Sequence, residues 1–200
     1  KKQAISDRIN LVNLPKSYRN IRMTDFDINN ESRMKAMSQL LDFVETYPSY
    51  NHKGLYLYGD MGVGKSYLMA AMARELSERK GVSTTLLHFP SFAIDVKNAI
   101  SSGTVKDEID AVKSVPILIL DDIGAEQATS WVRDEILQVI LQHRMLEELP
   151  TFFTSNYSFN DLERKWANIK GSDETWQAKR VMERVRYLAI EFHLEGPNRR

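Results

Sequence analysis

The sequence predicts an α/β fold in which helices cover both faces of a parallel β-sheet. Short apolar runs alternate with segments of helical periodicity, which is typical of successive strand–helix units. The run at residues 115–120 is almost wholly apolar, as expected for a strand that is covered on both faces. The 200 residues suit one medium domain, and the chain has no cysteine for a disulfide or a thiolate zinc site.

The first part of the chain is the least regular. Residues 1–30 are mixed and polar, and we expect them to form an arm packed on the core. Residues 31–47 carry apolar side chains at helical spacing, and Pro48 ends that helix. An apolar strand at 55–58 follows. Residues 31–200 are therefore expected to form the main domain.

The rest of the chain repeats the alternation of strand and helix. Gly81 closes one helix, and a Ser-Ser-Gly break at 101–103 separates two others. Helices are expected over 66–79, 91–100, 105–112, 131–146, 161–166 and 177–186, and further strands over 84–89, 115–120, 151–154 and 187–192.

Charge and hydropathy narrow the classes of function. The 27 basic and 27 acidic residues balance, whereas a dedicated DNA-binding protein is usually basic, so any nucleic-acid contact needs a local patch. No run of 18 or more apolar residues occurs, and the N-terminus lacks an apolar signal core. We expect a cytoplasmic protein that has no contact with a membrane.

A glycine-rich loop directly follows the strand at 55–58. Residues 59–66 match the pattern G-x-x-x-x-G-K-[ST], in which backbone N–H groups hold phosphate oxygens. Lys65 is expected to reach the β- and γ-phosphates and Ser66 to bind Mg²⁺. The alternative, a plain glycine turn with an exposed lysine, is disfavoured by the strand before the loop and the helix after it. The residues expected to contact the nucleotide are Gly59, Asp60, Met61, Gly62, Val63, Gly64, Lys65, Ser66 and Tyr67.

An acidic pair ends the apolar strand at 115–120. In a phosphate-loop enzyme such an acid holds Mg²⁺, a role that Asp121 fits. Asp122 points differently and could orient or deprotonate the attacking water. The alternative is an acidic helix cap, which the phosphate loop earlier in the chain makes less favourable.

The strand at 151–154 also ends in polar residues. The amide of Asn156 could hydrogen-bond the attacking water or the γ-phosphate. A single asparagine is more often a turn residue, but its place in the series of strands favours the functional interpretation.

In these features the chain resembles the AAA+ ATPases, with Gly59–Ser66 as Walker A, Ile117–Asp122 as Walker B and Asn156 as sensor 1. More narrowly, it is similar to the bacterial replicative-helicase loaders of the DnaI/DnaC family, over nearly all 200 residues. The segments that show this similarity are "LPKSYRNIRMTDFD", "GLYLYGDMGVGKSYLMAA", "LILDDIGAE" and "RVMERVRYLAIEF".

The resemblance implies a fold, a cofactor and partners. Family members have a five-stranded parallel sheet between helices, bind ATP or ADP with Mg²⁺, contact single-stranded DNA, and help to place the ring-shaped hexameric helicase on DNA. Their separate N-terminal zinc-binding domain, which grips the helicase, is expected to be absent here because the sequence has no cysteine.

The block "KRVMERVR" matches the family segment that carries the arginine finger, and Arg184 is the expected finger for a neighbour's ATP. Arg184 lies at the flank of an apolar helix stripe, where it can be half-buried at a subunit boundary and reach a phosphate. The alternative is a solvated basic helix, since Arg180 and Arg186 lie nearby.

Two features depart from the family. Many members have Asp-Glu where this chain has Asp121-Asp122, and the shorter Asp122 predicts slow hydrolysis. Only eight residues follow Phe192, so we expect the C-terminal helical lid to be reduced or absent. The sensor 2 arginine would then be Arg199 or Arg200.

Residues 90–113 correspond to the family's DNA-contacting region. They contain Phe92, Lys97, Lys106 and Lys113, a combination that suits base stacking and phosphate contact. From the residues alone, the acidic neighbours favour the alternative, an ordinary pair of amphipathic helices with Phe92 packed inward, so that DNA contact is implied only by the resemblance.

The leading hypothesis is therefore a slow, self-associating ATPase that serves a helicase loader. The alternatives are a transposase-helper ATPase of the IstB type and a nucleotide-locked scaffold with little turnover. The four histidines, His52, His88, His143 and His193, are scattered and are expected to be packed or surface residues.

Overall fold

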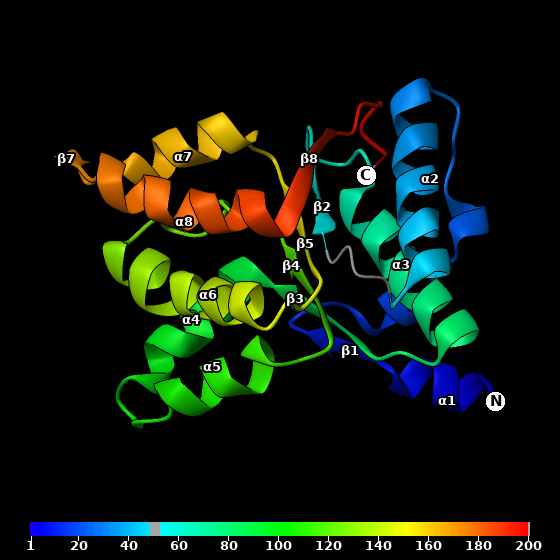
Figure 1. Cartoon of the computed structure of the whole chain (residues 1–200), viewed down its shortest axis with the longest axis horizontal. Coiled ribbons are helices and arrows are strands. Elements are labelled where there is room, and N and C mark those ends of the chain that lie inside the picture. Colours follow the sequence, from blue (N-terminus) through cyan, green and yellow to red (C-terminus); the bar gives the residue numbers. More distant parts are fainter. Residues whose placement is uncertain (49–52, 200) are drawn as a thin grey trace.

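The computed structural model describes residues 1–48 and 53–199. A six-stranded sheet runs through its centre in the order β1-β3-β4-β5-β2-β8, with every neighbouring pair parallel (Figure 1). The strands of this sheet are β1 (Ile9–Val12), β2 (Lys53–Tyr58), β3 (Thr84–His88), β4 (Ile117–Asp121), β5 (Thr151–Ser155) and β8 (Ala189–His193).

Helices cover both faces of the sheet. Figure 1 shows α1, α2 and α3 on one side and α4 to α8 on the other. A two-stranded hairpin of β6 (Asn168–Ile169) and β7 (Ser172–Asp173) joins α7 to α8. The helices are α1 (Lys2–Asp7), α2 (Glu31–Thr46), α3 (Lys65–Lys80), α4 (Phe89–Ala99), α5 (Val105–Lys113), α6 (Gln138–Leu146), α7 (Phe159–Ala167) and α8 (Thr175–Leu188), with short 3₁₀ turns at Lys16–Asn20 and Met23–Asp25.

Each face of the sheet has its own hydrophobic core. The arm, α2 and α3 enclose one core, and α4 to α8 enclose the other. Strand β4 is buried along its whole length, as its apolar sequence predicted. On α8, Val181, Val185 and Leu188 face the second core, which leaves the flank of the helix to its arginines.

The sheet has six strands rather than the expected five. The additional strand is β1, which comes from the arm and pairs with β3 from Ile9 opposite Thr84 to Val12 opposite Leu87. Only four residues form β1, and Asn10 interrupts their apolar character, so the sequence gives no period that would reveal a strand.

The helix expected over 131–146 is not uniform. Val132–Leu137 forms a π-helical segment that continues into α6. Arg133 in this segment is buried, where its guanidinium donates to the carbonyl of Trp166 and pairs with Glu174 at the start of α8. A buried arginine that needs several acceptors gives a reason for the local widening, because π-helical turns commonly occur where a side chain must be re-aimed.

After β8 the described chain contains no further helix up to residue 199. Within residues 1–48 and 53–199, none of the helices combines the length and the apolar character that crossing a bilayer requires.

Candidate nucleotide-binding site

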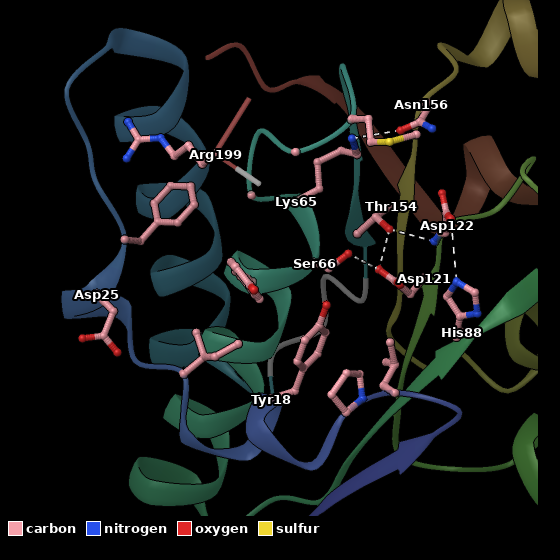
Figure 2. Close-up of a pocket in the computed structure, with 18 of the residues that line it drawn as sticks. Tyr18, Asp25, Lys65, Ser66, His88, Asp121, Asp122, Thr154, Asn156 and Arg199 are labelled. Carbon is pink, nitrogen blue, oxygen red and sulfur yellow. Dashed lines mark hydrogen bonds and ion pairs between the residues drawn. The ribbon is translucent and has the colours of Figure 1, made fainter. Parts of the chain in front are cut away.

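The adjacent strands β4, β5 and β2 end at the same edge of the sheet, where a cavity of about 660 Å³ opens. Figure 2 shows the polar side chains that follow these strands gathered at one wall of the cavity. In a parallel α/β sheet, ligands bind at the carboxyl ends of the strands. The cavity therefore lies where the sequence predicted a nucleotide.

The phosphate loop starts at the end of β2 and leads into α3. Gly64 is the N-cap residue of α3 and has a φ of 100°, in the left-handed region that favours glycine. A Cβ on Gly62 would lie 2.2 Å from the side-chain oxygen of Asn198. The loop thus needs glycine both for its turn and for the close passage of the C-terminal tail. Val63 is buried in the core, so that only its backbone is available to a ligand.

Lys65 ties the loop to β5. Its Nζ donates to the carbonyls of Gly59 at 2.7 Å and Asp60 at 2.8 Å, and to the Oδ1 of Asn156 at 3.1 Å. The lysine and the asparagine, which are far apart in sequence, thus meet as expected for Walker A and sensor 1 residues. Met61 and Tyr67 line the cavity, whereas Asp60 is exposed at its edge.

Ser66, Asp121 and Thr154 form a compact hydrogen-bonded cluster. The Oδ1 of Asp121 accepts from the hydroxyl of Ser66 at 2.6 Å and from that of Thr154 at 2.8 Å. Asp121 is only 5% exposed, and burial raises its pKa above the usual value, while the two hydroxyls act in the opposite direction.

This donor set fits Mg²⁺, which prefers hydroxyl and carboxylate oxygens together with substrate phosphates. Among the described residues, no group of three or more His, Cys, Asp or Glu side chains could hold a metal ion by itself. A magnesium ion at Ser66 and Asp121 would therefore depend on the nucleotide for its other ligands.

Asp122 is held in an unusual conformation beside His88. Its φ is 60°, and its N–H donates to the hydroxyl of Thr154 at 2.8 Å. Its Oδ2 lies 3.7 Å from the Nε2 of His88, and this contact raises the pKa of the imidazole above its usual value despite partial burial. The hydroxyl of Ser91, on α4, lies 2.8 Å from the other ring nitrogen.

His88 was not expected at the site. From the sequence we expect a packed or surface residue, but His88 lines the cavity next to Asp122, the predicted general base. The signal that could have identified it is its position at the end of β3, the strand that neighbours β4 in the sheet.

The opposite wall of the cavity comes from the arm and α3. Tyr18 and Tyr67 meet edge to face, with their ring centroids 5.5 Å apart, and Phe26 lies above Gly64. Arg33 of α2 is 1% exposed, with its guanidinium 4.2 Å from the centre of the Phe26 ring, and its Nη1 donates to the carbonyl of Val63 at 2.5 Å. This buried arginine also lines the cavity and holds the loop through the carbonyl of Val63, a role that its sequence position does not reveal.

The C-terminal tail reaches the same cavity. The N–H of Arg199 donates to the carbonyl of Gly62 at 3.0 Å, and its guanidinium donates to Asp27 at 2.8 Å. Arg199 lines the cavity, so it is in place for the predicted sensor 2 position. Arg200 lies outside the described residues.

Arg184 is not part of this cavity. It lies half-buried on α8, where it donates to the side chain of Gln142 at 2.6 Å and to the carbonyl of Arg180 at 2.6 Å. Burial lowers the pKa of its guanidinium. Its role as a finger for a neighbouring subunit stays a prediction.

Phe92 is 2% exposed and belongs to the core, as in the interpretation that the residues favoured, and it is not available to stack on DNA bases. Its position on the inner face of α4 follows from the helical spacing of Phe89, Phe92 and Val96. Lys106 and Lys113 both pair with Asp110, which offsets their charge. The described surface of α4 and α5 therefore presents no aromatic side chain for stacking on bases.

Comparison with known proteins agrees with this geometry. Residues 1–189 match the family model of the IstB-like ATP binding proteins. The chain is 44% identical over 176 residues to the replicative helicase loader DnaI of Bacillus subtilis (strain 168), which covers 87% of this chain and 56% of that protein. The chain thus spans little more than half the length of this curated relative.

Solved structures give the same result. The chain is similar to a candidate primosome component from Streptococcus pyogenes serotype M3, with 74% identity over 100% of both chains and a TM-score of 0.87. A crystal structure of DnaI matches at 39% identity and a TM-score of 0.84, covering 98% of this chain and 99% of that one. Domain III of the Thermotoga maritima initiation protein DnaA, at 17% identity and a TM-score of 0.70 over 92% of this chain and 69% of that chain, shares the fold.

The predicted resemblance to the DnaI/DnaC family is confirmed by these similarities. Since the family model spans nearly the whole sequence, the chain belongs to the IstB-like ATP-binding protein family and has the AAA+ fold.

Proposed function

We propose that this chain is the ATPase domain of a replicative-helicase loader, which binds and hydrolyses ATP and, with single-stranded DNA, helps to load the replicative DNA helicase during primosome assembly. The similarity to DnaI supports the loader role. The observation that carries the ATP chemistry is the set of hydrogen bonds that ties Lys65 and Ser66 of the loop to Asn156, Asp121 and Thr154 at the strand ends.

Lys65 is the main charge that meets the nucleotide. Its ammonium group now rests on the carbonyls of Gly59 and Asp60, and phosphate oxygens would replace those weaker acceptors. Backbone N–H groups of the loop and the start of α3 add to the attraction for an anion. Catalysis by these groups consists of positioning and charge neutralisation.

Asp122 and Asn156 act on the attacking water. Asp122 accepts its proton, and Asn156 orients it by a hydrogen bond from its amide. The backbone of Asp122 is hydrogen-bonded to Thr154, and its Oδ2 lies 3.7 Å from the Nε2 of His88. Protonated His88 would compete with the water for this carboxylate, which favours slow turnover.

Ser66 and Asp121 would hold Mg²⁺. When bound, the ion neutralises charge on the β- and γ-phosphate oxygens. Arg199 reaches the phosphates from the tail side as the sensor 2 residue, and Arg184 acts on the nucleotide of a neighbouring copy. Hydrolysis therefore depends on self-association.

The proposed partners follow from the loader role. The helicase ring would be bound mainly by the N-terminal domain of the family, which these 200 residues do not include. The protein would act in the cytoplasm. ATP would favour self-association around single-stranded DNA, and hydrolysis would reverse it.

The test of this function is single-turnover hydrolysis at increasing protein concentration, with and without single-stranded DNA. Arg184→Ala should remove the concentration-dependent stimulation, a loss of about 10³-fold or more for an arginine finger, and leave nucleotide affinity nearly intact. Arg180→Ala, one helical turn away, is the matched control and should retain stimulation. If Arg184→Ala is stimulated like wild type, Arg184 has no role as a finger.

Two other functions each have one favourable observation. The family match favours a transposase-helper ATPase of the IstB type. The pairing of Asp122 with His88 favours a nucleotide-locked scaffold. Capture of a helicase ring separates the loader from the transposase helper, and hydrolysis at background combined with loss of partner binding in Lys65→Ala identifies the scaffold.

A further inference from the structure

Glu126 is a buried carboxylate that the mechanism above does not use. It lies in the loop after β4, is 6% exposed, and does not line the cavity. Its Oε2 accepts the N–H of Gly124 at 2.7 Å, and its Oε1 accepts the indole N–H of Trp166, on α7, at 3.3 Å. Burial raises the pKa of Glu126, whereas these two donors and the charge of Lys165 favour its ionised form.

Gly124 is held from three directions. The carboxylate of Glu126 accepts a hydrogen bond from the N–H of Gly124, and the ammonium group of Lys165 donates one to the carbonyl of Gly124. A Cβ on Gly124 would lie 2.9 Å from side-chain atoms of both Leu162 and Tyr157, and its φ of 97° also favours glycine. The peptide units on both sides of Gly124 therefore have one tightly defined position.

The segment before Gly124 is Asp122 and Ile123, and β5 holds it on the other side. The N–H groups of Asp122 and Ile123 donate to the hydroxyl and the carbonyl of Thr154, at 2.8 and 3.0 Å. Asp122 itself has a φ of 60°, which costs free energy for a residue other than glycine and persists only where surrounding contacts enforce it. The contacts on the β5 side fix the start of the turn, and those from α7 fix its end.

We propose that Glu126 and Lys165 form a clamp on Gly124 that positions Asp122 for its reaction with water. Glu126 is a positioning residue in this scheme, since it touches neither the cavity nor Asp122. The inference rests on the proposed function, because Asp122 must be the group that acts on water.

The hydrogen bonds of Glu126 show why the clamp needs it. Removing Glu126 leaves Lys165 half-buried beside a carbonyl and leaves the N–H of Gly124 and the indole N–H of Trp166 without their acceptor. A buried donor that loses its partner destabilises the local conformation, so the turn is expected to relax away from the strained φ of Asp122.

The experiment compares Glu126→Ala and Glu126→Gln with Glu163→Gln. Glu163 lies on α7 and pairs with Arg186 rather than with Gly124, so this variant controls for loss of a carboxylate elsewhere in the same region. Single-turnover hydrolysis should fall about 10- to 100-fold in Glu126→Ala, because small displacements of a catalytic group have effects of this size. Glu126→Gln keeps an oxygen acceptor and should lie between Glu126→Ala and wild type.

Affinity for ADP, measured by calorimetry, should stay within about twofold in all three variants, since none touches the cavity. Hydrolysis by Glu126→Ala at the wild-type rate would overturn the clamp. A loss of ADP affinity in parallel with the rate would also overturn it, because the whole site would then have been disturbed.

Hydrogen exchange tests the clamp without any reaction. The amide of Gly124 should exchange about tenfold faster in Glu126→Ala than in Glu163→Gln. If wild-type hydrolysis is at background, the proposed catalytic function fails, and equal exchange at Gly124 in the two variants then rejects the clamp on its own account.

Discussion

The two walls of the nucleotide cavity are built from different chemistry. The strand-end wall consists of polar residues that are hydrogen-bonded to one another. The arm wall combines aromatic and aliphatic side chains with several charged ones, and its members come from chain segments far apart in sequence. The strand-end wall comprises Lys65, Ser66, Asp121, Asp122, Thr154 and Asn156, and the arm wall comprises Tyr18, Ile21, Phe26, Tyr67 and Arg199.

This difference shows how the work of binding and reaction is divided. Groups that stabilise developing charge must be fixed before the substrate arrives, and the mutual hydrogen bonds of the strand-end wall provide that. The adenine base of the nucleotide needs mainly apolar and aromatic surface, and such contacts tolerate small shifts of the ring. We therefore expect variants of the first wall to affect hydrolysis, whether or not they affect affinity, and variants of the aromatic residues in the second wall to affect affinity alone.

The largest effect is expected at Lys65. Lys65→Met removes a cation that faces phosphate oxygens, and charged hydrogen bonds contribute about 1.5–3 kcal/mol, so ATP should bind about 10- to 100-fold more weakly. Hydrolysis should be lost as well. Calorimetry with ATP and a single-turnover assay at saturating nucleotide measure the two effects. Retention of the wild-type rate at saturation would show that the first wall serves binding only.

A smaller effect is expected at the arm wall. Phe26→Ala should weaken ATP and ADP equally, by about 1–2 kcal/mol as for loss of one aromatic contact with a base, and leave the single-turnover rate at saturation unchanged. Tyr67→Ala is the comparison, because it tests the Tyr18–Tyr67 end of the same wall. A larger loss of affinity in Tyr67→Ala would place the base at that end instead.

The smallest effect concerns His88 and pH. The raised pKa of His88 means that its contact with Asp122 stabilises the fold fully below the unfolded pKa of about 6.5 and is lost as pH rises through the folded value. Asp122 is released over the same window, so the hydrolysis rate should rise with pH by about two- to fivefold, as for an exposed pair of up to about 1 kcal/mol.

In His88→Gln the hydrolysis rate should no longer depend on pH in this range, and it should equal the rate that wild type reaches at high pH. Asp121 and the hydroxyl of Ser91 also face the imidazole, and Ser91→Ala, which keeps the carboxylates, should retain the slope. A profile in His88→Gln that matches wild type would exclude the histidine as its source.

The strand-end wall could be predicted from the sequence because its signals are local. The phosphate loop is a contiguous pattern, and Asp121 and Asn156 each directly follow an apolar strand. His88 also follows a strand, yet a histidine at a strand end has several ordinary explanations. Only the order β3-β4-β5 in the sheet brings it against Asp122.

The arm wall could not be predicted to the same extent because it is assembled by tertiary contacts. Arg33 reads as one charged residue of an amphipathic helix, and only the packing of α2 on α3 brings it beneath the loop. Strand β1 is too short to show a period, and the hydrogen bond that brings Arg199 to Gly62 joins residues far apart in sequence.

The hydrogen bond from Arg199 to Gly62 also has a practical meaning for protein engineering. Any polypeptide joined after the last residue departs from the rim of the nucleotide cavity. A fluorescent reporter or purification tag at that end would lie beside the cavity that ATP enters. A tag placed before Lys1 would instead start from α1, next to the edge strand β1 (Figure 1). Assays of turnover should therefore be made on protein labelled at its amino end.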